Sequence, residues 1–600
     1  MLGPVRPSSD WRHPPYCRGL STDNSHMTAP RFVAFLGRSD PAPDHGYVGM
    51  APISLKAPID LWATDHVVML GDQGAVIGHL FTRSIPSRTI TELNPAEINA
   101  ALVTRGQSLI RDYWGGYVAI FRDVGGDLVV VRDPSGALPA YWREFEGTIA
   151  VAAQIGEHPF AFQDGVRLDA DGLLVHLWNP HHAGEQTCLA GVRELLAGQK
   201  LQVRSGRCRT DALWKPWSFL PDEHDMQVPA PSAFRDIILN AVRTWADAFP
   251  VILSGISGGL DSSIVSLGVN WSNAQLHGLH MSWTDREGDE RAFAITMATA
   301  LGSPLDIVPY DLSIINIERP IVPSVARPFT AHYAQCTALA QTAIAERCGI
   351  SAFFNGDGGD NVFCLMLSVA PILDRLRARH GVTSVLQTAA DVARLTGADC
   401  PTILTHILRR LVRGARPPIA SDDKSYLDRA RLEAAIKSVA RHPWYDPPGN
   451  ISQGKAAHIR AICRAMGNDG FHDRRFHAPS ISPLLSQPVM EQCLKIPTWN
   501  WVEGGMDRAL VRRAFQHDLP HAIVSRKTKG GPSGFLDQFF WENENRILSY
   551  LRSGLLVDLG ILTDLPEQGS ARKGSGYARS HARRLLGLTG AESWARQWVG

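Results

Sequence analysis

The chain has 600 residues, of which 44% are hydrophobic and 20% are charged, a composition that is ordinary for a globular protein and leaves room for roughly two to four domains. Its formal net charge of +1 gives no general reason to expect binding to nucleic acid or to an anionic membrane. The nine cysteines include no Cys-x-x-Cys pair, which argues against a disulfide framework and a zinc site, and there is no apolar run of about 18 residues. We therefore expect a cytoplasmic protein without a membrane span.

Residues 1–26 are rich in Pro, Ser, Arg and His and have no apolar centre, so they do not form a secretory signal. We expect them either to be disordered or to precede a true start at Met27. From Arg31 to about residue 218, short apolar runs alternate with Gly and Asp turns, which predicts a β-rich layer with helical segments around 96–112 and 168–178. The expected strands lie at 32–36, 67–70, 75–77, 117–121, 128–132 and 148–152.

Three stretches in this region carry a family resemblance. Residues 113–120 (YWGGYVAI), 132–141 (RDPSGALPAY) and 191–198 (GVRELLAG) resemble the N-terminal glutaminase-type domain of the asparagine synthetase family. The resemblance implies an αββα sandwich whose catalytic residue is an N-terminal cysteine. Here the residues after Met1 and Met27 are Leu2 and Thr28, and glutaminase activity would require cleavage before the internal Cys17. Because glutamine hydrolysis needs a nucleophile, we interpret residues 27–218 as a glutaminase-like domain without activity.

Prolines and acidic residues between 219 and 233 predict a linker to a second domain, which we expect to occupy residues 234–600. In that domain residues 234–248 have helical apolar spacing, 276–281 and 305–308 read as strands, and 289–302 as a helix that stops at Gly302. Alternating strands and helices predict a doubly wound parallel sheet, with ligands at the carboxyl ends of its strands. Backbone groups near Ile256 and Met281 would then flank an adenine.

The strongest motif covers residues 251–263 (VILSGISGGLDSS), where an apolar strand ends in small residues and a helical pattern follows. Unpaired backbone N–H groups at such a turn carry the positive end of the helix dipole and suit a phosphate. We expect Ser257, Gly258, Gly259 and Ser262 to bind nucleotide phosphates, and Asp261 to hold Mg²⁺ against them. No Gly-x-x-x-x-Gly-Lys-Ser/Thr pattern is present, so the motif is not a P-loop.

A second glycine-rich stretch, residues 352–363 (AFFNGDGGDNVF), follows another buried strand. Gly356 permits close approach to a ligand. The carboxylates of Asp357 and Asp360 would repel each other unless a positive group lay between them. Further on, 373–416 reads as helices with arginines at 409, 410, 413 and 416, either a solvated face or a contact for an acidic peptide.

The C-terminal part adds one further candidate. Lys529 precedes Gly530 and can reach a phosphate or a negative intermediate as a point charge, with Lys527 as the alternative. His472 and His477 have no Cys or Glu at ligand spacing and do not predict a metal site. The tail from 569 is rich in Gly, Ser and Arg, so we expect it to be mobile before a final short helix.

These C-terminal motifs also resemble those of the asparagine synthetase family. Together with the N-terminal stretches, the resemblance covers about residues 31–220 and 232–540. Residues 257–263 resemble the pyrophosphate loop of ATP pyrophosphatases, which cleave ATP to AMP and pyrophosphate. In the family a Gly-Glu-Gly-x-Asp motif stands where residues 356–360 lie, which implies that Asp360 and Asp261 are magnesium ligands. Asp357 replaces a glutamate that acts near the nucleophilic amine, and the matching lysine stabilises the adenylate and transition state.

The resemblance therefore implies an ATP- and Mg²⁺-dependent ligase that forms an amide through an acyl adenylate. Residues 356–363 with 528–531 look most like lasso peptide cyclases, which join the N-terminal amine of a core peptide to an Asp or Glu side chain. Such an enzyme works with a companion leader protease and a leader-binding protein. The alternatives are a β-lactam synthetase, an ammonia-dependent asparagine synthetase-like enzyme, and a non-catalytic scaffold of a peptide-maturation complex.

Overall fold

The computed structural model describes most of the chain from Ala29 to Trp598. The described residues are 29–37, 47, 49–56, 58–64, 66–157, 165–182, 184–221, 228–283, 289–322, 325–413, 423–449, 451–466, 474, 477–527, 533–567, 569 and 576–598. The expected N-terminal segment 1–26, including Cys17, lies outside them.

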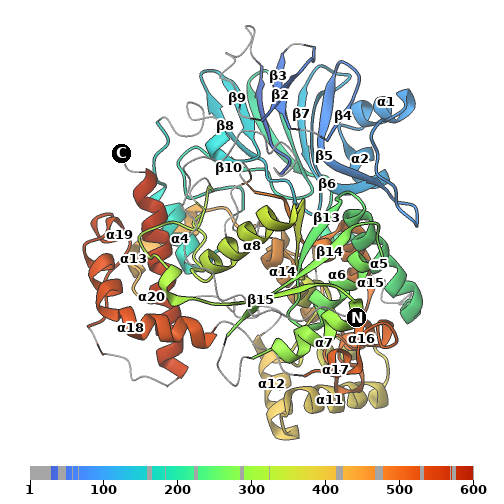
Figure 1. The fold of residues 1–600 in the computed structure, drawn as a ribbon, viewed down its shortest axis with the longest axis vertical. Helices are drawn as coiled ribbons and strands as arrows, with labels where there is room; N and C mark the ends of the chain where they lie inside the picture. Colours follow the sequence, from blue (N-terminus) through green and yellow to red (C-terminus); the bar gives the residue numbers. More distant parts are fainter. Residues whose placement is uncertain are drawn as a thin grey trace.

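Two six-stranded antiparallel sheets form the N-terminal sandwich (Figure 1). The first has the order β10-β8-β9-β1-β3-β2, with bounds Phe32–Leu36 (β1), Ala51–Ile53 (β2), Ile59–Ala63 (β3), Tyr141–Phe145 (β8), Thr148–Ala152 (β9) and Arg193–Glu194 (β10). The second has the order β12-β11-β7-β6-β5-β4, with bounds Val67–Met69 (β4), Gly74–Thr82 (β5), Tyr113–Arg122 (β6), Leu128–Arg132 (β7), Gln199–Arg204 (β11) and Arg207–Ala212 (β12).

Alternation of side chains along β6 explains why this strand is buried almost throughout. Val118 and Ile120 face the first sheet, and Ala119 and Phe121 face helices on the outside. Helices α1 (Pro95–Val103) and α2 (Gln107–Asp112) cover that side, and α4 (Ala170–Trp178) covers the outer face of the first sheet. The predicted αββα sandwich is confirmed, with the expected 96–112 helix divided in two by Gly106 at a φ of 83°.

A five-stranded parallel sheet forms the centre of the second half. Its order is β15-β14-β13-β16-β17, with bounds Val251–Gly255 (β13), Gln275–Ser282 (β14), Leu305–Pro309 (β15), Ala352–Phe354 (β16) and Ser480–Ile481 (β17). Helices cover both faces of this sheet. The neighbouring residues Ile252 and Leu253 point to opposite faces. Ile252 packs among α5 (Pro231–Ala246), α6 (Leu260–Asn270) and α7 (Arg291–Leu301), and Leu253 packs on α8 (Ala334–Cys348). The predicted doubly wound sheet is confirmed.

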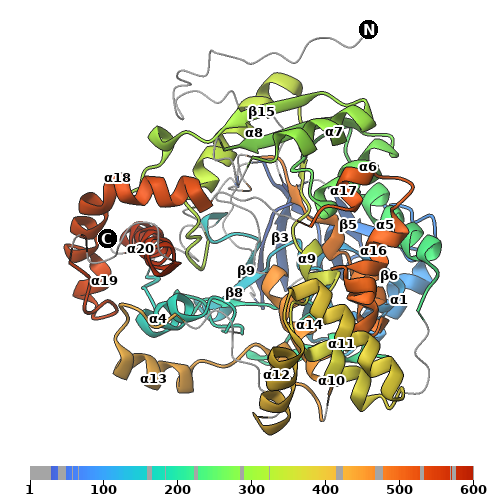
Figure 2. The same ribbon diagram turned by 90° about the horizontal axis from the view of Figure 1, so that it is seen from below.

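The added helices lie mainly in two groups, at opposite sides of the view in Figure 2. They are α9 (Gly359–Val362), α10 (Ala370–Arg377), α11 (Val382–Thr396), α12 (Cys400–Arg413), α13 (Arg429–Ser438), α14 (Gln453–Met466), α15 (Gln487–Lys495), α16 (Ala509–Ala514), α17 (His521–Val524), α18 (Ser533–Arg552), α19 (Leu555–Asp558) and α20 (Gly576–Ala595). The expectation of a short final helix was wrong, because α20 has 20 residues. Its apolar side chains, including Leu585 and Trp594, share a buried cluster with those of α18.

The outer face of the second sheet is also covered by an element from the second half of the chain. On α5, Trp245 meets His79, Phe81 and Trp114 of the second sheet, with ring centroids 5.4, 5.1 and 6.5 Å away. Helix α5 begins at Pro231, inside the expected linker, because proline is favoured in the first turn of a helix. Among the described residues, no helix combines the length and the apolar character needed to cross a membrane.

Candidate functional site

The turn between β13 and α6 has the geometry of an anion-binding loop. Ser257 Oγ lies 2.9 Å from Ser262 Oγ and accepts a hydrogen bond of 3.2 Å from the backbone N–H of Gly259. No side chain within the described ranges caps the N-terminus of α6, so its first N–H groups lack the usual capping partner. Gly258 has a φ of 68°, and a Cβ there would lie 2.3 Å from Cβ of Phe293. The loop therefore requires glycine at this position.

The acidic loop between β16 and α9 is pressed against the start of α6. A Cβ on Gly356 would lie 2.6 Å from the backbone nitrogen of Ser262, and one on Gly359 would lie 2.4 Å from Cγ of Asp261. Neither neighbour can move easily, because one is a backbone atom and the other is the carboxyl carbon of a short, buried side chain. The glycines of residues 356–359 thus let the two loops meet, and the contact brings Asp360 to Asp261.

Arg508 lies between these two aspartates. Its Nη1 atom donates to Asp261 Oδ1 and Oδ2 at 3.0 and 2.9 Å and to Asp360 Oδ1 at 2.5 Å. Burial alone would lower the pKa of Arg508, but the carboxylates of Asp261, Asp360 and Asp507 raise it above its ordinary value. Arg508 therefore stays charged. It precedes α16 and belongs to no motif that we used, so sequence reasoning missed it.

Asp507 forms a further layer behind Arg508. Its carboxylate accepts from Arg508 Nη2 at 2.7 Å and from Arg512 Nη2 at 2.7 Å. Arg512 Nε also donates to the backbone carbonyl of Asp507 at 2.9 Å. These bonds fix the backbone that carries Arg508, whose φ of 51° is unusual for a residue with a side chain.

Asp357 has different neighbours from Asp360. Its backbone N–H donates to Asn355 Oδ1 at 2.9 Å, and Ser482 Oγ donates to the same oxygen at 2.8 Å. The side chain of Asp357 is exposed, and its charge acts on Tyr333. Burial first and the Asp357 carboxylate second raise the pKa of the Tyr333 hydroxyl. Tyr333, the N-cap of α8, is half-buried and packs against the same apolar cluster as Met281, Trp283 and Tyr310, so the structure adds it to the predicted site.

The two residues expected near an adenine lie at adjacent strand ends. Ile256 follows β13 and has a buried side chain, and Met281 is half-buried near the end of β14. His280 Nδ1 is 3.0 Å from the carbonyl oxygen of Ile256 and joins the two ends. Burial lowers the pKa of His280.

Aromatic side chains stand next to these strand ends. Trp283 follows β14, and Tyr310 follows β15. Both pack against Phe535 of α18, with ring centroids 5.1 and 4.9 Å apart. An aromatic cluster therefore lies beside the carboxyl edge of the sheet. No local sequence pattern predicts this cluster, because its members are far apart in the chain.

The predicted lysine stretch is only partly described. Lys529, Gly530 and Gly531 lie outside the described residues, whereas Lys527 is exposed. The preceding Arg526 donates to the carbonyl oxygen of Gly258 at 3.1 Å and pairs with Glu290 at 2.5 Å. Its guanidinium lies 4.1 Å from the ring centroid of Phe293. Arg526 thus places the beginning of this stretch against the anion-binding loop.

Within the described ranges, no group of three or more His, Cys, Asp or Glu side chains could hold a metal ion. The sequence predicts no metal site at His472 and His477; His472 lies outside the described ranges and His477 lies within them. Asp261 and Asp360 nevertheless suit magnesium, which binds through one or two carboxylates together with substrate phosphates. Their oxygens lie within hydrogen-bond distance of one nitrogen atom, so they are close enough to share a cation.

The comparisons with known proteins identify one family. The model of the family described as asparagine synthase matches residues 233–596. No curated protein matches the chain. The solved structures similar to it include a glutamine phosphoribosylpyrophosphate amidotransferase from B. subtilis complexed with ADP and GMP, at 9% identity, covering 56% of this chain and 86% of that one, with a TM-score of 0.19. Another is the allosteric regulatory enzyme of purine biosynthesis, at 9% identity, 56% and 85% coverage and a TM-score of 0.20. Scores this low carry no functional conclusion.

Proposed function

The chain belongs to the asparagine synthase family, whose chemistry is ATP-dependent amide-bond formation, and we propose that it adenylates a peptide carboxylate with magnesium and closes a macrolactam. The observation that carries the proposal is the convergence of Asp261, Asp360 and Arg508 at the anion-binding loop. This set combines carboxylates for a divalent cation with backbone and guanidinium donors for phosphates.

Adenylation makes the carboxylate reactive, because AMP leaves far more readily than hydroxide. In this step a carboxylate oxygen attacks the α-phosphorus of ATP, and the bond to pyrophosphate breaks. The loop at Ser257–Ser262 would bind the departing pyrophosphate through its backbone N–H groups. Arg508 adds a positive charge at the same place.

Asp261 and Asp360 would hold magnesium, which neutralises phosphate charge when it is bound. Both carboxylates accept hydrogen bonds from Arg508. The guanidinium of Arg508 could also donate to phosphate oxygens, because its fork of N–H groups matches their geometry.

Amide formation then requires an uncharged amine next to the acyl adenylate. Asp357 would orient the amine and accept its proton, and its charge acts on the half-buried Tyr333. The amine nitrogen bonds to the acyl carbon, and AMP leaves with the bonding electrons. Lys529 would stabilise the developing oxyanion, as its motif resemblance implies, and Lys527 is the alternative.

The proposed substrate is a lasso peptide core, whose N-terminal amine attacks its own Asp or Glu side chain. Two features support a substrate larger than aspartate. Asp357 is one methylene shorter than the glutamate in the family motif, and the cluster of Trp283, Tyr310 and Phe535 offers apolar surface at the carboxyl edge of the sheet. A companion leader protease and a leader-binding protein would prepare this substrate. A β-lactam synthetase or an ammonia-dependent synthetase uses the same chemistry on smaller molecules.

Mass spectrometry of a candidate core peptide incubated with the protein, ATP and Mg²⁺ tests the proposal, with the D261N variant as control. Loss of one water from the peptide, with AMP and pyrophosphate formed and all products absent in D261N, is the expected result. AMP without peptide dehydration would reject the macrolactam and point to a smaller acid or amine. No nucleotide cleavage with any carboxylate would reject the enzyme and favour the non-catalytic scaffold.

A further inference from the structure

The segment of residues 325–333 leads directly into the candidate site, because Tyr333 is its last residue and is the N-cap of α8. The N-terminal sandwich holds the start of this segment. The carbonyl oxygen of Ala326 accepts from the backbone N–H of Cys188 at 3.0 Å. Arg327 Nη2 donates to the carbonyl oxygens of Gly184 and Gln186 at 3.0 and 2.8 Å.

Helices α20 and α4 hold the segment at three further residues. Trp594 Nε1 donates to the carbonyl oxygen of Val325 at 3.0 Å. His332 Nε2 lies 3.1 Å from the carbonyl oxygen of Leu586 and 2.9 Å from Thr589 Oγ1. His176 of α4 reaches the carbonyl oxygen of Pro328 at 3.3 Å. The backbone that precedes Tyr333 is therefore held from both sides.

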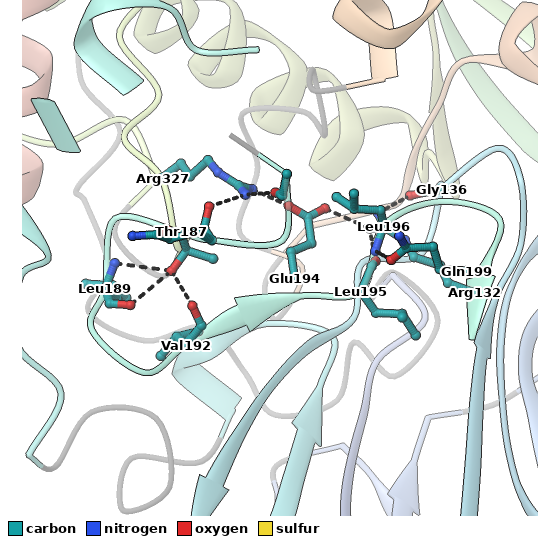
Figure 3. Close-up of polar contacts among 12 residues, drawn as sticks. Arg132, Gly136, Thr187, Leu189, Val192, Glu194, Leu195, Leu196, Gln199 and Arg327 are labelled. Carbon is teal, nitrogen blue, oxygen red and sulfur yellow. Dashed lines mark hydrogen bonds and ion pairs between the residues drawn. The ribbon is translucent and has the colours of Figure 1, made fainter. Parts of the chain in front are cut away.

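Glu194 is the central ion of the contact with the sandwich (Figure 3). One carboxylate oxygen accepts from Arg132 Nη1 at 2.7 Å, and the other pairs with Arg327 Nη1. Burial by itself would raise the pKa of Glu194, but Arg327 and Arg132 outweigh it and hold the pKa below its ordinary value. Arg132 is itself held by the carbonyl oxygens of Gly136, Leu138 and Leu195. The ionised Glu194 thus ties Arg327 to the rigid frame of the sandwich.

We propose that Glu194 is a positioning residue, which acts through Arg327 to place Tyr333 at the reaction centre. This inference rests on the proposed function, and it gives the sandwich a role in positioning the site. The sandwich would set the geometry of the half of the site that receives the amine. The half that binds ATP is built by β13, α6 and α9 and does not use this anchor.

The experiment compares E194Q with E491Q. Glu491 of α15 is a matched control, because it also forms an ion pair between the two halves of the chain. Its partner is Arg83, whose Nη1 atom lies 2.7 Å from the carboxylate. Glu491 does not contact the 325–333 segment in any described bond. For each variant, ATP–pyrophosphate exchange with a candidate peptide measures adenylation, and peptide dehydration measures amide formation.

In E194Q we expect dehydration to fall about tenfold or more while exchange stays within about threefold, because a small misplacement at a reacting centre is costly. E194D, which keeps the charge, should recover part of the loss. E491Q should leave the ratio of the two rates unchanged. Equal loss of both rates in E194Q, or no loss, would overturn the proposal.

Hydrogen exchange measured by mass spectrometry tests the anchor independently of activity. Peptides that cover 325–333 should exchange faster in E194Q than in E491Q, and peptides that cover 251–262 should be equal in the two. Equal protection of 325–333 in both variants would overturn the anchoring. A wild-type protein without pyrophosphate exchange would instead reject the proposed function, and the hydrogen-exchange result would still decide the anchoring.

Discussion

Arg508 and Asp360 form the contact that closes the candidate site, with Nη1 of the arginine 2.5 Å from Oδ1 of the aspartate and 2.9 Å from Oδ2 of Asp261. The two carboxylates come from different loops, and each would repel the other without a positive group between them. Arg508 therefore joins the two loops of the candidate site. It also occupies the position that a shared cation requires.

The R508M variant tests this double role. Without magnesium it should be less stable by about 3 kcal/mol, because removing one partner of a buried ion pair leaves uncompensated charge. Added Mg²⁺ should raise its melting temperature more than that of the wild type, since no guanidinium competes for the carboxylates. The measurement is thermal unfolding with and without MgCl₂. R513M is the control, because Arg513 pairs with Glu503 in a more exposed position, and an equal magnesium effect in R508M and R513M would contradict the prediction.

The close approach of the two loops predicts the effect of a single methyl group. In G359A the new Cβ would meet Cγ of Asp261 at 2.4 Å, so the loops must separate. ATP–pyrophosphate exchange should fall about a hundredfold or more, because the ligands for phosphate and magnesium lose their alignment. G587A in α20 is the control, since its Cβ would find only ordinary contacts with Thr330 at 4.0 Å. If G359A exchanges as fast as G587A, the apposition of the loops is not needed for activity.

Different roles for the two aspartates of residues 356–360 predict different kinetic defects. D357N should keep pyrophosphate exchange within about threefold and lose amide formation by about a hundredfold, the usual contribution of a general base. Y333F should share this pattern to a smaller degree, because Asp357 acts on the Tyr333 hydroxyl. D360N should lose both activities. Parallel loss of exchange in D357N and D360N would show that the two aspartates act as one unit.

Buried histidines make stability depend on pH. Burial lowers the pKa of His458 from 6.5 to about 3, and Nε2 of this residue lies 2.8 Å from the carbonyl oxygen of Val362. Between these two values the unfolded chain binds more protons than the folded protein, so stability falls as pH falls below 6.5. From about pH 6.5 to about pH 5 the loss is about 2 kcal/mol for one such histidine.

Thermal unfolding across this range checks the histidine prediction. The melting temperature should fall on acidification in the wild type and fall less in H458Q, in which glutamine can keep the donor to Val362. His79 and His176 also have pKa values lowered to about 3 by burial, so H458Q should remove only part of the slope. Identical slopes in wild type and H458Q would contradict the assignment.

Local sequence patterns predicted the parts of the site that are continuous in the chain. Residues 251–263 and 352–360 each combine a buried strand with a glycine turn, and periodicity with turn chemistry is enough to recognise both. Arg508 could not be found in this way. It lies far along the chain from both loops, and its position depends on tertiary packing of α16 and on Asp507 rather than on a local motif.

The same limit applies to the sandwich and to the tail. The stretches 132–141 and 191–198 indicate a family resemblance in the sequence, and the structure gives a physical reason for both, because Arg132 and Glu194 form one buried ion pair. The length of the helix at 576–595 does not follow from the sequence, because the composition from residue 569 onward is typical of a mobile tail. Burial of its apolar face against α18 stabilises this helix, and that partner is not visible in local composition.

The central claim is that the protein activates a carboxylate by adenylation. The most direct measurement incubates the protein, ATP and Mg²⁺ with a candidate peptide whose carboxylate oxygens carry ¹⁸O, and then analyses the nucleotide by mass spectrometry. We predict one labelled oxygen in AMP and none in pyrophosphate, since the acyl oxygen stays on AMP when the amine displaces it. Label in inorganic phosphate together with ADP would contradict the account, because it would show an acyl phosphate instead.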